Sequence, residues 1–234
     1  MLLEARAIDA GYGKVPVLHG VALGVAAGEC VAILGPNNAG KSTLLKVLSG
    51  LVGVWRGNLQ FEGADITPDG PSERVRRGLI QVPEGRHVFP DLTVAENLIV
   101  GGLRLGSHRA RRARLERVYD SFKPLYELRH RPAGMLSGGE QQLVAIARGL
   151  MAEPRVLMLD EPSLGLSPVA VDLVFGTLLG LKQESLTMIV VEQNVQFCFD
   201  LASRGYVLRQ GRVVSQVEAM EHLTADALRQ AYLG

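Results

Sequence analysis

The stretch from Gly35 to Thr43 constrains the fold of this chain more than any other feature of its sequence. It follows an apolar run, residues 30–34, that predicts a buried strand, and it leads into a helical pattern over residues 41–49. A strand, a loop of the form G-x-x-x-x-G-K-[ST] and a helix, in that order, are typical of a phosphate-binding loop. We therefore predict an α/β fold built around a site for a phosphorylated ligand.

Each part of this loop has a physical role in anion binding. Successive backbone N–H groups form a concave donor surface, and the N-terminus of the helix adds N–H donors and a partial positive charge. Lys41 supplies a full charge to the outer phosphates, and Ser42 offers a hydroxyl to Mg²⁺. Asn38 stands where many such loops carry glycine, and asparagine tolerates a positive φ better than most residues, so we expect the loop to form. The candidate nucleotide-binding residues of the loop are Gly35, Pro36, Asn37, Asn38, Ala39, Gly40, Lys41, Ser42 and Thr43.

Two further segments favour ligand binding. The apolar run 156–159 predicts a buried strand that ends directly in Asp160 and Glu161, and the carboxyl ends of strands are where ligands bind in open α/β sheets. Ser137, Gly138 and Gly139 precede a helical pattern that continues to Leu150, which gives a second helix N-terminus suited to anions.

The rest of the chain is predicted from hydrophobic periodicity and capping signals. Strands are expected at residues 2–10, 17–25, within 53–63, at 79–82 and 186–191, and as a pair over 205–217 around a turn at 210–211. Helices are expected at residues 71–78, at 94–98 after a capping Thr93, over 107–129, at 168–184 and 195–203, and as short helices over 218–233. The arginines at 109, 111, 112, 114 and 117 favour a solvated helix face, with a face toward lipid headgroups or an acidic partner as the alternative.

Composition excludes several classes of protein. The 234 residues suffice for one large domain or one domain with an inserted lobe, and 5% aromatic residues against 47% hydrophobic ones imply an aliphatic core. A net charge of +1 argues against a nucleic-acid partner.

No apolar run reaches the ~18 residues needed to span a bilayer, and residues 1–6 do not resemble a signal peptide, so we expect a cytosolic protein able to dock onto a membrane protein. Cys30 and Cys198 are expected to be buried free thiols.

Three motifs in sequence order resemble the nucleotide-binding subunits of ABC transporters. They are the loop 35–43, the segment Leu136-Ser137-Gly138-Gly139-Glu140 and the apolar strand that ends in Asp160-Glu161. The resemblance covers essentially the whole chain. It implies an α/β P-loop NTPase of the ABC type, with a RecA-like core, an antiparallel β subdomain and a small helical subdomain. Residues 1–234 would form a single ABC ATPase domain, with the ATP-binding core and β subdomain at 1–90 and 151–234 and the helical signature subdomain at about 91–150.

Narrower motifs resemble the shorter ATPase subunit of the branched-chain amino acid importers. These are the segments 82–86, 89–90, 92–98, 163–168 and 191–194. Close relatives in that branch import urea or short-chain amides, so the resemblance leaves the solute open. Two other classes remain as alternatives. One is a soluble ABC ATPase of translation or DNA repair, which usually has two cassettes or a coiled-coil insertion. The other is a regulatory subunit that binds ATP and hardly hydrolyses it.

The resemblance implies an ATP site with a bound Mg²⁺ ion. Tyr12 would stack on the adenine, Lys41 would neutralise the phosphates, and Ser42 and Asp160 would hold the metal ion, with Glu84 as a further ligand. A glutamine usually links the nucleotide to the transmembrane partner; Glu84 occupies its place by counting back from Pro90, and Gln81 is the weaker candidate.

The resemblance also implies the groups that hydrolyse ATP. Glu161 would polarise the attacking water, a role that needs a carboxylate near the γ-phosphate. Gln193 occupies the place of the usual switch histidine, and its amide can donate and accept at once. The catalytic residues predicted in this way are Glu161, Gln193 and Lys41.

The partners implied by the resemblance are proteins. Ser137, Gly138 and Gly139 would cap the γ-phosphate of ATP on a second ATPase subunit, in a head-to-tail homo- or heterodimer. Opening of the dimer after hydrolysis would reach transmembrane permease subunits through residues 84–106, and a periplasmic solute-binding protein indirectly. The subunit would lie peripherally on the cytoplasmic face of the inner membrane, with no nucleic-acid partner.

Overall fold

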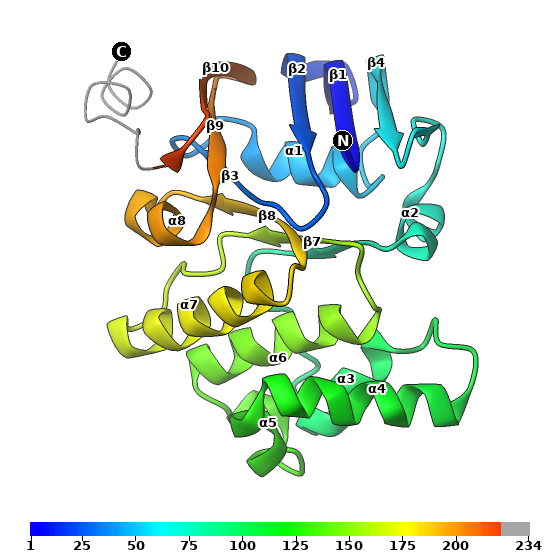
Figure 1. Ribbon diagram of the computed structural model, residues 1–234, viewed down its shortest axis with the longest axis vertical. Coiled ribbons are helices and arrows are strands. Elements are labelled where there is room, and N and C mark those ends of the chain that lie inside the picture. The colour runs from blue at the N-terminus through cyan, green and yellow to red at the C-terminus, as the bar shows by residue number, and fades with distance from the viewer. Residues whose placement is uncertain (221–234) are drawn as a thin grey trace.

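Two sheets, with helices between and below them, form the part of the chain that the structure describes (Figure 1). The structure is a computed structural model, and it describes residues 1–220. Short helices were predicted over 218–233, and the part of that range from residue 221 on lies outside the described residues.

The first sheet is antiparallel and has the strand order β2-β1-β4-β5. Its strands are β1 (Leu3–Tyr12), β2 (Val15–Val25), β4 (Val54–Phe61) and the short β5 (Ala64–Asp65). Helix α1 (Lys41–Leu48) lies beneath this sheet in Figure 1 and separates it from the second sheet. The strands predicted at residues 2–10, 17–25 and within 53–63 are confirmed, and β5 was not predicted, because its two residues are too few to show a periodic pattern.

The second sheet has the strand order β10-β9-β3-β8-β7-β6 and is parallel apart from β10. Its strands are β3 (Cys30–Leu34), β6 (Leu79–Val82), β7 (Val156–Asp160), β8 (Thr187–Glu192), β9 (Arg204–Arg209) and β10 (Arg212–Val217). Because β3, β7 and β8 are parallel neighbours, their carboxyl ends meet at one edge. That edge therefore receives the phosphate loop, Asp160-Glu161 and Gln193.

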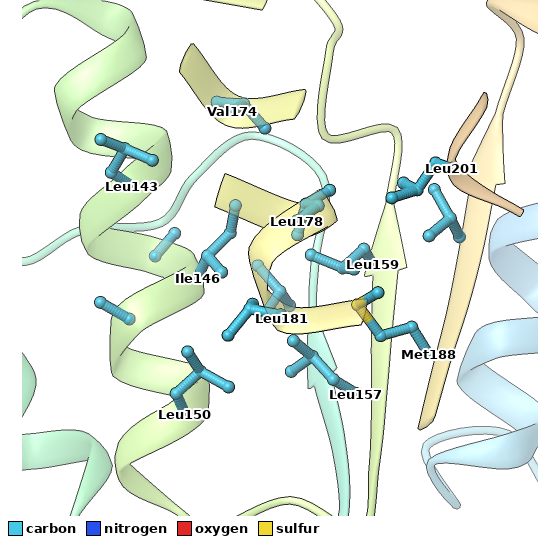
Figure 2. Close-up of a cluster of buried hydrophobic side chains, with 14 of the residues drawn as sticks. Leu143, Ile146, Leu150, Leu157, Leu159, Val174, Leu178, Leu181, Met188 and Leu201 are labelled. Carbon is cyan, nitrogen blue, oxygen red and sulfur yellow. The ribbon is translucent and has the colours of Figure 1, made fainter. Parts of the chain in front are cut away.

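Alternate residues of the parallel strands face two separate cores. Val31 and Ile33 of β3 pack with α1 and the antiparallel sheet, whereas Ala32 and Leu34 pack on the opposite face. Strands buried on both faces read as continuous apolar runs, and this is why residues 30–34 and 156–159 carry no polar alternation. The lower core lies between the sheet and helices α6 (Gly138–Met151) and α7 (Pro168–Gln183) (Figure 2). The residues labelled there are Leu143, Ile146, Leu150, Leu157, Leu159, Val174, Leu178, Leu181, Met188 and Leu201.

Most helices begin at the expected capping signals. They are α2 (Pro71–Arg77), α3 (Val94–Gly101), α4 (His108–Ser121), α5 (Lys123–Glu127), α6 (Gly138–Met151), α7 (Pro168–Gln183) and α8 (Val195–Leu201), with a short 3₁₀ turn at Ala133–Met135. Thr93 forms the predicted capping box with Glu96, and Ser137 forms another with Glu140. The single helix predicted over 107–129 is wrong: it breaks at Phe122, since Pro124 cannot continue α4 and instead lies in the first turn of α5.

The basic run on α4 is mainly a solvated face. Arg109, Arg112 and Arg117 are exposed, whereas Arg111 and Arg114 fold back onto backbone carbonyls of Leu105 and Leu150. Cys30 and Cys198 are buried free thiols, as predicted, and burial raises the pKa of Cys30 to about 12. Within residues 1–220, no helix combines the length and apolar character that crossing a bilayer requires.

One charged residue in the fold was not anticipated from the sequence. Arg74 of α2 is only 2% exposed, and its guanidinium donates to the carbonyls of Val47, Leu48 and Ile66. The first two of these carbonyls belong to the last turn of α1, where a helix leaves its acceptors unpaired and where positive charge is favourable. Arg74 thus closes the helix that begins at the phosphate loop.

We expect Arg74→Met to lower the free energy of unfolding by about 2–4 kcal/mol, because the apolar side chain fills similar space, removes the donor to the buried Leu48 carbonyl and removes one of the donors to the carbonyls of Val47 and Ile66. The matched control is Arg76→Met, since Arg76 lies on the same helix with an exposed side chain. Urea denaturation of both variants measures the difference. Equal stabilities for the two variants would contradict the role of Arg74.

Candidate nucleotide-binding site

The loop between β3 and α1 has the backbone that an anion-binding loop needs. Asn38 has a φ of +62°, in the left-handed region that its side chain tolerates, as predicted. Gly40 has a φ of +101° and caps α1. A Cβ on Gly35 would lie 2.1 Å from the carbonyl oxygen of Leu208, so only glycine fits at the start of the loop.

Lys41 places a positive charge inside the loop. Its side chain is 4% exposed, and Nζ donates to the carbonyl oxygens of Gly35 at 2.8 Å and Pro36 at 3.2 Å. The same Nζ lies 3.2 Å from Oε1 of Glu161. A buried ammonium group needs such partners, because its hydration is lost. The structure therefore brings together the predicted phosphate-binding lysine and the predicted catalytic acid.

Ser42 and Asp160 form an adjacent pair of oxygen donors. Oγ of Ser42 donates to Oδ1 of Asp160 at 3.1 Å. Burial raises the pKa of Asp160 to about 6; the Ser42 hydrogen bond and the charge of Lys41 lower it, and the charges of Glu84 and Glu161 raise it. Excess negative charge at this position fits a divalent cation, and Mg²⁺ is commonly held by one carboxylate, a hydroxyl, phosphates and water.

A cavity of about 620 Å³ opens above these residues. It is lined by Val17, Asn37, Asn38, Ala39, Gly40, Lys41, Ser42, Thr43, Glu84, Glu161, Leu164 and Gln193. Gly35, Pro36 and Asp160 do not line the cavity, but Gly35 and Pro36 accept hydrogen bonds from Lys41, and Asp160 accepts one from Ser42. Glu84 rather than Gln81 reaches the cavity, because Oε1 of Gln81 accepts a hydrogen bond from Ser49 elsewhere.

Tyr12 lies at the rim of the phosphate loop rather than in this cavity. Its ring is 47% exposed, and its hydroxyl is 3.4 Å from Oγ1 of Thr43. Nζ of Lys46 lies 6.0 Å from the ring centroid. An exposed ring beside the last loop residue suits a purine, so stacking on adenine stays a prediction for Tyr12.

Ser137, Gly138 and Gly139, which we call the signature residues, lie outside the cavity around Lys41. Ser137 is exposed at the start of α6, Gly138 lies under the guanidinium of Arg86, and Gly139 is buried against Ala170 of α7. A Cβ on Gly139 would lie 2.6 Å from that of Ala170, so this glycine permits the close packing of α6 and α7. The single chain does not bring Ser137, Gly138 or Gly139 to its own phosphate loop.

Two residues beside the site were not identified from the sequence. Arg86 donates to the carbonyl oxygen of Gly165 at 3.2 Å, which links the loop after β6 to the loop after β7. Glu192, the last residue of β8, is 2% exposed. The available signal for Glu192 is a charged residue at the end of a strand that is otherwise apolar.

Comparison with known proteins identifies the family. The sequence pattern of the family described as ABC transporter matches residues 18–164. The chain belongs to the ABC transporter family. The predicted resemblance to ABC nucleotide-binding subunits is confirmed, as is the predicted activity class of this ABC ATPase, ATP hydrolysis coupled to transport.

Individual relatives resemble this ABC ATPase along their whole length. It is 40% identical to the high-affinity branched-chain amino acid transport ATP-binding protein BraG of Pseudomonas aeruginosa, with 100% of both chains covered. It is 33% identical to the lipopolysaccharide export ATP-binding protein LptB of Acidithiobacillus ferridurans, covering 100% of this chain and 97% of that protein. The ADP conformation of MJ1267, an ATP-binding cassette of an ABC transporter, superposes with a TM-score of 0.87 at 28% identity, covering 100% and 98% of the two chains. The predicted fold class is confirmed.

We expect Asp160→Asn to stabilise the protein without nucleotide by about 1–3 kcal/mol at pH 8, because it removes a buried charge and keeps an acceptor for Ser42. The folded-state pKa of Asp160 is raised to about 6, so its contribution to stability is complete below its unfolded pKa of about 4 and is lost as pH rises through 6. Thermal unfolding of both proteins from pH 4 to pH 8 measures this difference.

The same variant should lose the stabilisation that ATP with Mg²⁺ gives the wild type, because Asp160 would hold the metal ion. A stability difference that does not change with pH, or a variant that Mg²⁺ and ATP still stabilise fully, would contradict this account of Asp160.

Proposed function

We propose that this ABC ATPase is the ATP-hydrolysing subunit of an importer for branched-chain amino acids. The observation that carries the proposal is the cavity in which Lys41, Ser42 and Glu161 converge, in a chain that resembles BraG over its full length. ATP binding is a property of the family. The solute is inferred from the BraG likeness and from the motifs at 82–86 and 191–194.

The geometry supports a division of roles within the cavity. Loop amides and Lys41 would bind the β- and γ-phosphates, and Ser42 and Asp160 would hold Mg²⁺, with Glu84 as a further ligand. Mg²⁺ would neutralise the charge that develops on the phosphates. Glu161 is close enough to Lys41 to stand beside the γ-phosphate, where it would accept a proton from water oriented by Gln193.

The site requires a second subunit. Ser137, Gly138 and Gly139 lie away from the chain's own phosphate loop, at the exposed N-terminus of a 14-residue helix. In a head-to-tail homo- or heterodimer this helix would face the γ-phosphate bound by the other subunit. Loss of that phosphate removes the bridge, so hydrolysis would open the dimer.

An apolar groove on the helical side suits a transmembrane permease subunit. The groove has a volume of about 620 Å³ and is lined by residues of β6, of the loop that follows it, and of α3 and α6. Phe89 is 45% exposed there and packs under the guanidinium of Arg148, 5.3 Å from the ring centroid. The groove adjoins Glu84, so a partner seated in it would contact the loop that enters the nucleotide cavity.

The proposed arrangement has consequences for location and subdomains. A chain that binds a permease in this groove would lie peripherally on the cytoplasmic face of the inner membrane, and a periplasmic solute-binding protein would act on it only through the permease. We further propose that residues of about 91–150 form a helical subdomain beside the core at 1–90 and 151–234. The grouping of α3 to α6 below the sheet in Figure 1 supports this division.

A second candidate function is export, because LptB is also a full-length relative. Import of urea or short-chain amides, and a regulatory subunit with little hydrolysis, are the other outcomes that the following experiments separate.

Glu161→Gln should lower the hydrolysis rate by about a hundredfold or more and leave ATP affinity nearly unchanged, because the amide cannot accept the proton. The variant should also accumulate as an ATP-bound dimer in size-exclusion chromatography. Glu184→Gln serves as the control, since Glu184 is exposed and does not line the cavity. An unchanged hydrolysis rate in Glu161→Gln would refute the role of Glu161.

Purification from native membranes in mild detergent should recover two multi-span proteins, a second ATPase and a solute-binding protein, whose bound ligand names the solute. Recovery of ribosomal or DNA-repair proteins without a membrane chain would overturn the transport proposal. Recovery of lipopolysaccharide-export components would replace import with export.

Phe89→Asp should abolish this co-purification and preserve ATP binding, because a charge in the apolar groove opposes docking. Val214→Asp is the matched control, since Val214 is 52% exposed on β10 and lies outside the groove. Loss of the membrane proteins in both variants would contradict the assignment of the groove.

A further inference from the structure

Glu192 carries a buried carboxylate that joins two loops of the site. Oε1 accepts from the backbone N–H of Ser163 at 2.8 Å, in the loop after β7. Oε2 accepts from the backbone N–H groups of Gln193 at 3.1 Å and Asn194 at 3.2 Å, in the loop after β8. The two oxygens thus hold two segments that are about 30 residues apart in sequence and that both reach the nucleotide cavity.

The local sequence explains why a side chain is needed at this position. The β7–β8 pairing extends as far as the N–H of Glu161, which donates to the carbonyl oxygen of Val191 at 2.9 Å. Pro162 has no N–H, so the ladder cannot continue through it. The next donor is Ser163, and the Glu192 side chain supplies its acceptor.

The loop after β7 also begins in a conformation that needs support. Glu161 has a φ of +46°, in a region that costs free energy for a residue with a side chain. Such a conformation persists when neighbouring contacts fix it. The bonds from Glu161 to Val191 and from Ser163 to Glu192 hold the segment on both sides of Pro162.

Only a carboxylate satisfies all three backbone donors. Each carboxylate oxygen is an acceptor, whereas an amide has one acceptor oxygen and a donor NH₂ group. In Glu192→Gln, either orientation would set the NH₂ group against backbone N–H donors of one loop. Burial raises the pKa of Glu192, and hydrogen bonds from the Ser163 side chain and from the backbone N–H groups of Ser163, Asn194 and Gln193 act in the opposite direction, so these bonds favour the carboxylate form.

We propose that Glu192 is a positioning residue that sets Glu161 and Gln193 as one unit around the γ-phosphate. The inference deepens the proposed function and rests on the roles given there to Glu161 and Gln193. Through Ser163 it fixes the segment that carries Glu161, and through the N–H of Gln193 it fixes the loop that presents the amide. A change that the γ-phosphate causes at one loop is therefore carried to the other through a single side chain.

The test compares Glu192→Gln, Glu192→Asp and Glu29→Gln with the wild type. Glu29 is the matched control, because its side chain is 14% exposed, also accepts from a backbone N–H, and binds Arg204 at the opposite end of β3. Steady-state hydrolysis, ATP affinity, thermal midpoint and amide hydrogen exchange are measured for each protein.

We expect Glu192→Gln to lower kcat by at least about tenfold with ATP affinity within about threefold of the wild type, because the reacting groups are displaced and the phosphate loop is not. Glu192→Asp keeps two acceptor oxygens and should recover part of kcat. Amide exchange should accelerate together at Ser163, Gln193 and Asn194 in Glu192→Gln. Glu29→Gln should lower the thermal midpoint and leave kcat and those amides unchanged.

A kcat for Glu192→Gln within about twofold of the wild type would overturn the proposal. The proposal would also be overturned if kcat and ATP affinity fell together in proportion to the thermal midpoint, because destabilisation of the fold alone would produce that result. If the Glu161→Gln variant hydrolyses ATP at the wild-type rate, the proposed function is contradicted instead. Amide exchange needs no hydrolysis, so acceleration at only one of the two loops would still refute the joint role of Glu192.

Discussion

The buried ammonium group of Lys41 is the interaction on which the rest of the site depends. It is the positive charge that lies among the carboxylates of Glu161, Asp160 and Glu84 at the carboxyl edge of the parallel strands. One ammonium group does not neutralise three carboxylates, and the pKa of Asp160 is raised chiefly by burial and further by the charges of Glu84 and Glu161. The edge therefore suits further positive charge, and in the proposed function a nucleotide with Mg²⁺ would bring the phosphates for Lys41 and the cation for Asp160 at once.

The parallel sheet makes this concentration of charge possible. Because β3, β7 and β8 are buried on both faces, polar groups can follow them only where the strands end. The apolar layers shown in Figure 2 and the opposite core hold those ends in register, with Asp160 opposite Val191. The stability of the two cores thus supports a site where burial disfavours the charge of Asp160, so removing that charge would exchange the proposed metal binding for stability.

Local signals predicted most of the fold, and long-range contacts account for what they did not predict. Capping residues such as Thr93 and Ser137 fixed where helices begin, since their effect acts within one turn. The break at Phe122 had a local signal in Pro124 that the continuous pattern of arginines obscured. In the site, the loop and Asp160-Glu161 follow from motif and strand end. The burial of Arg74 and Glu192 depends on partners from other elements, which no periodicity reveals.

Helix α6 relates the nucleotide end of the molecule to the groove. Its N-terminal capping box presents Ser137 and Gly138, and its last turns carry Arg148, whose guanidinium donates to the carbonyl oxygen of His87 at 2.7 Å. His87 and Arg86 both have positive φ values, so this bond holds a strained loop against the helix. The loop in turn sets the guanidinium of Arg86 over Gly138. The groove, the loop and the N-terminal end of α6 are thus attached to one continuous helix, because Arg148 near its C-terminal end binds the loop and Gly138 at its N-terminal end lies beside Arg86 of the same loop.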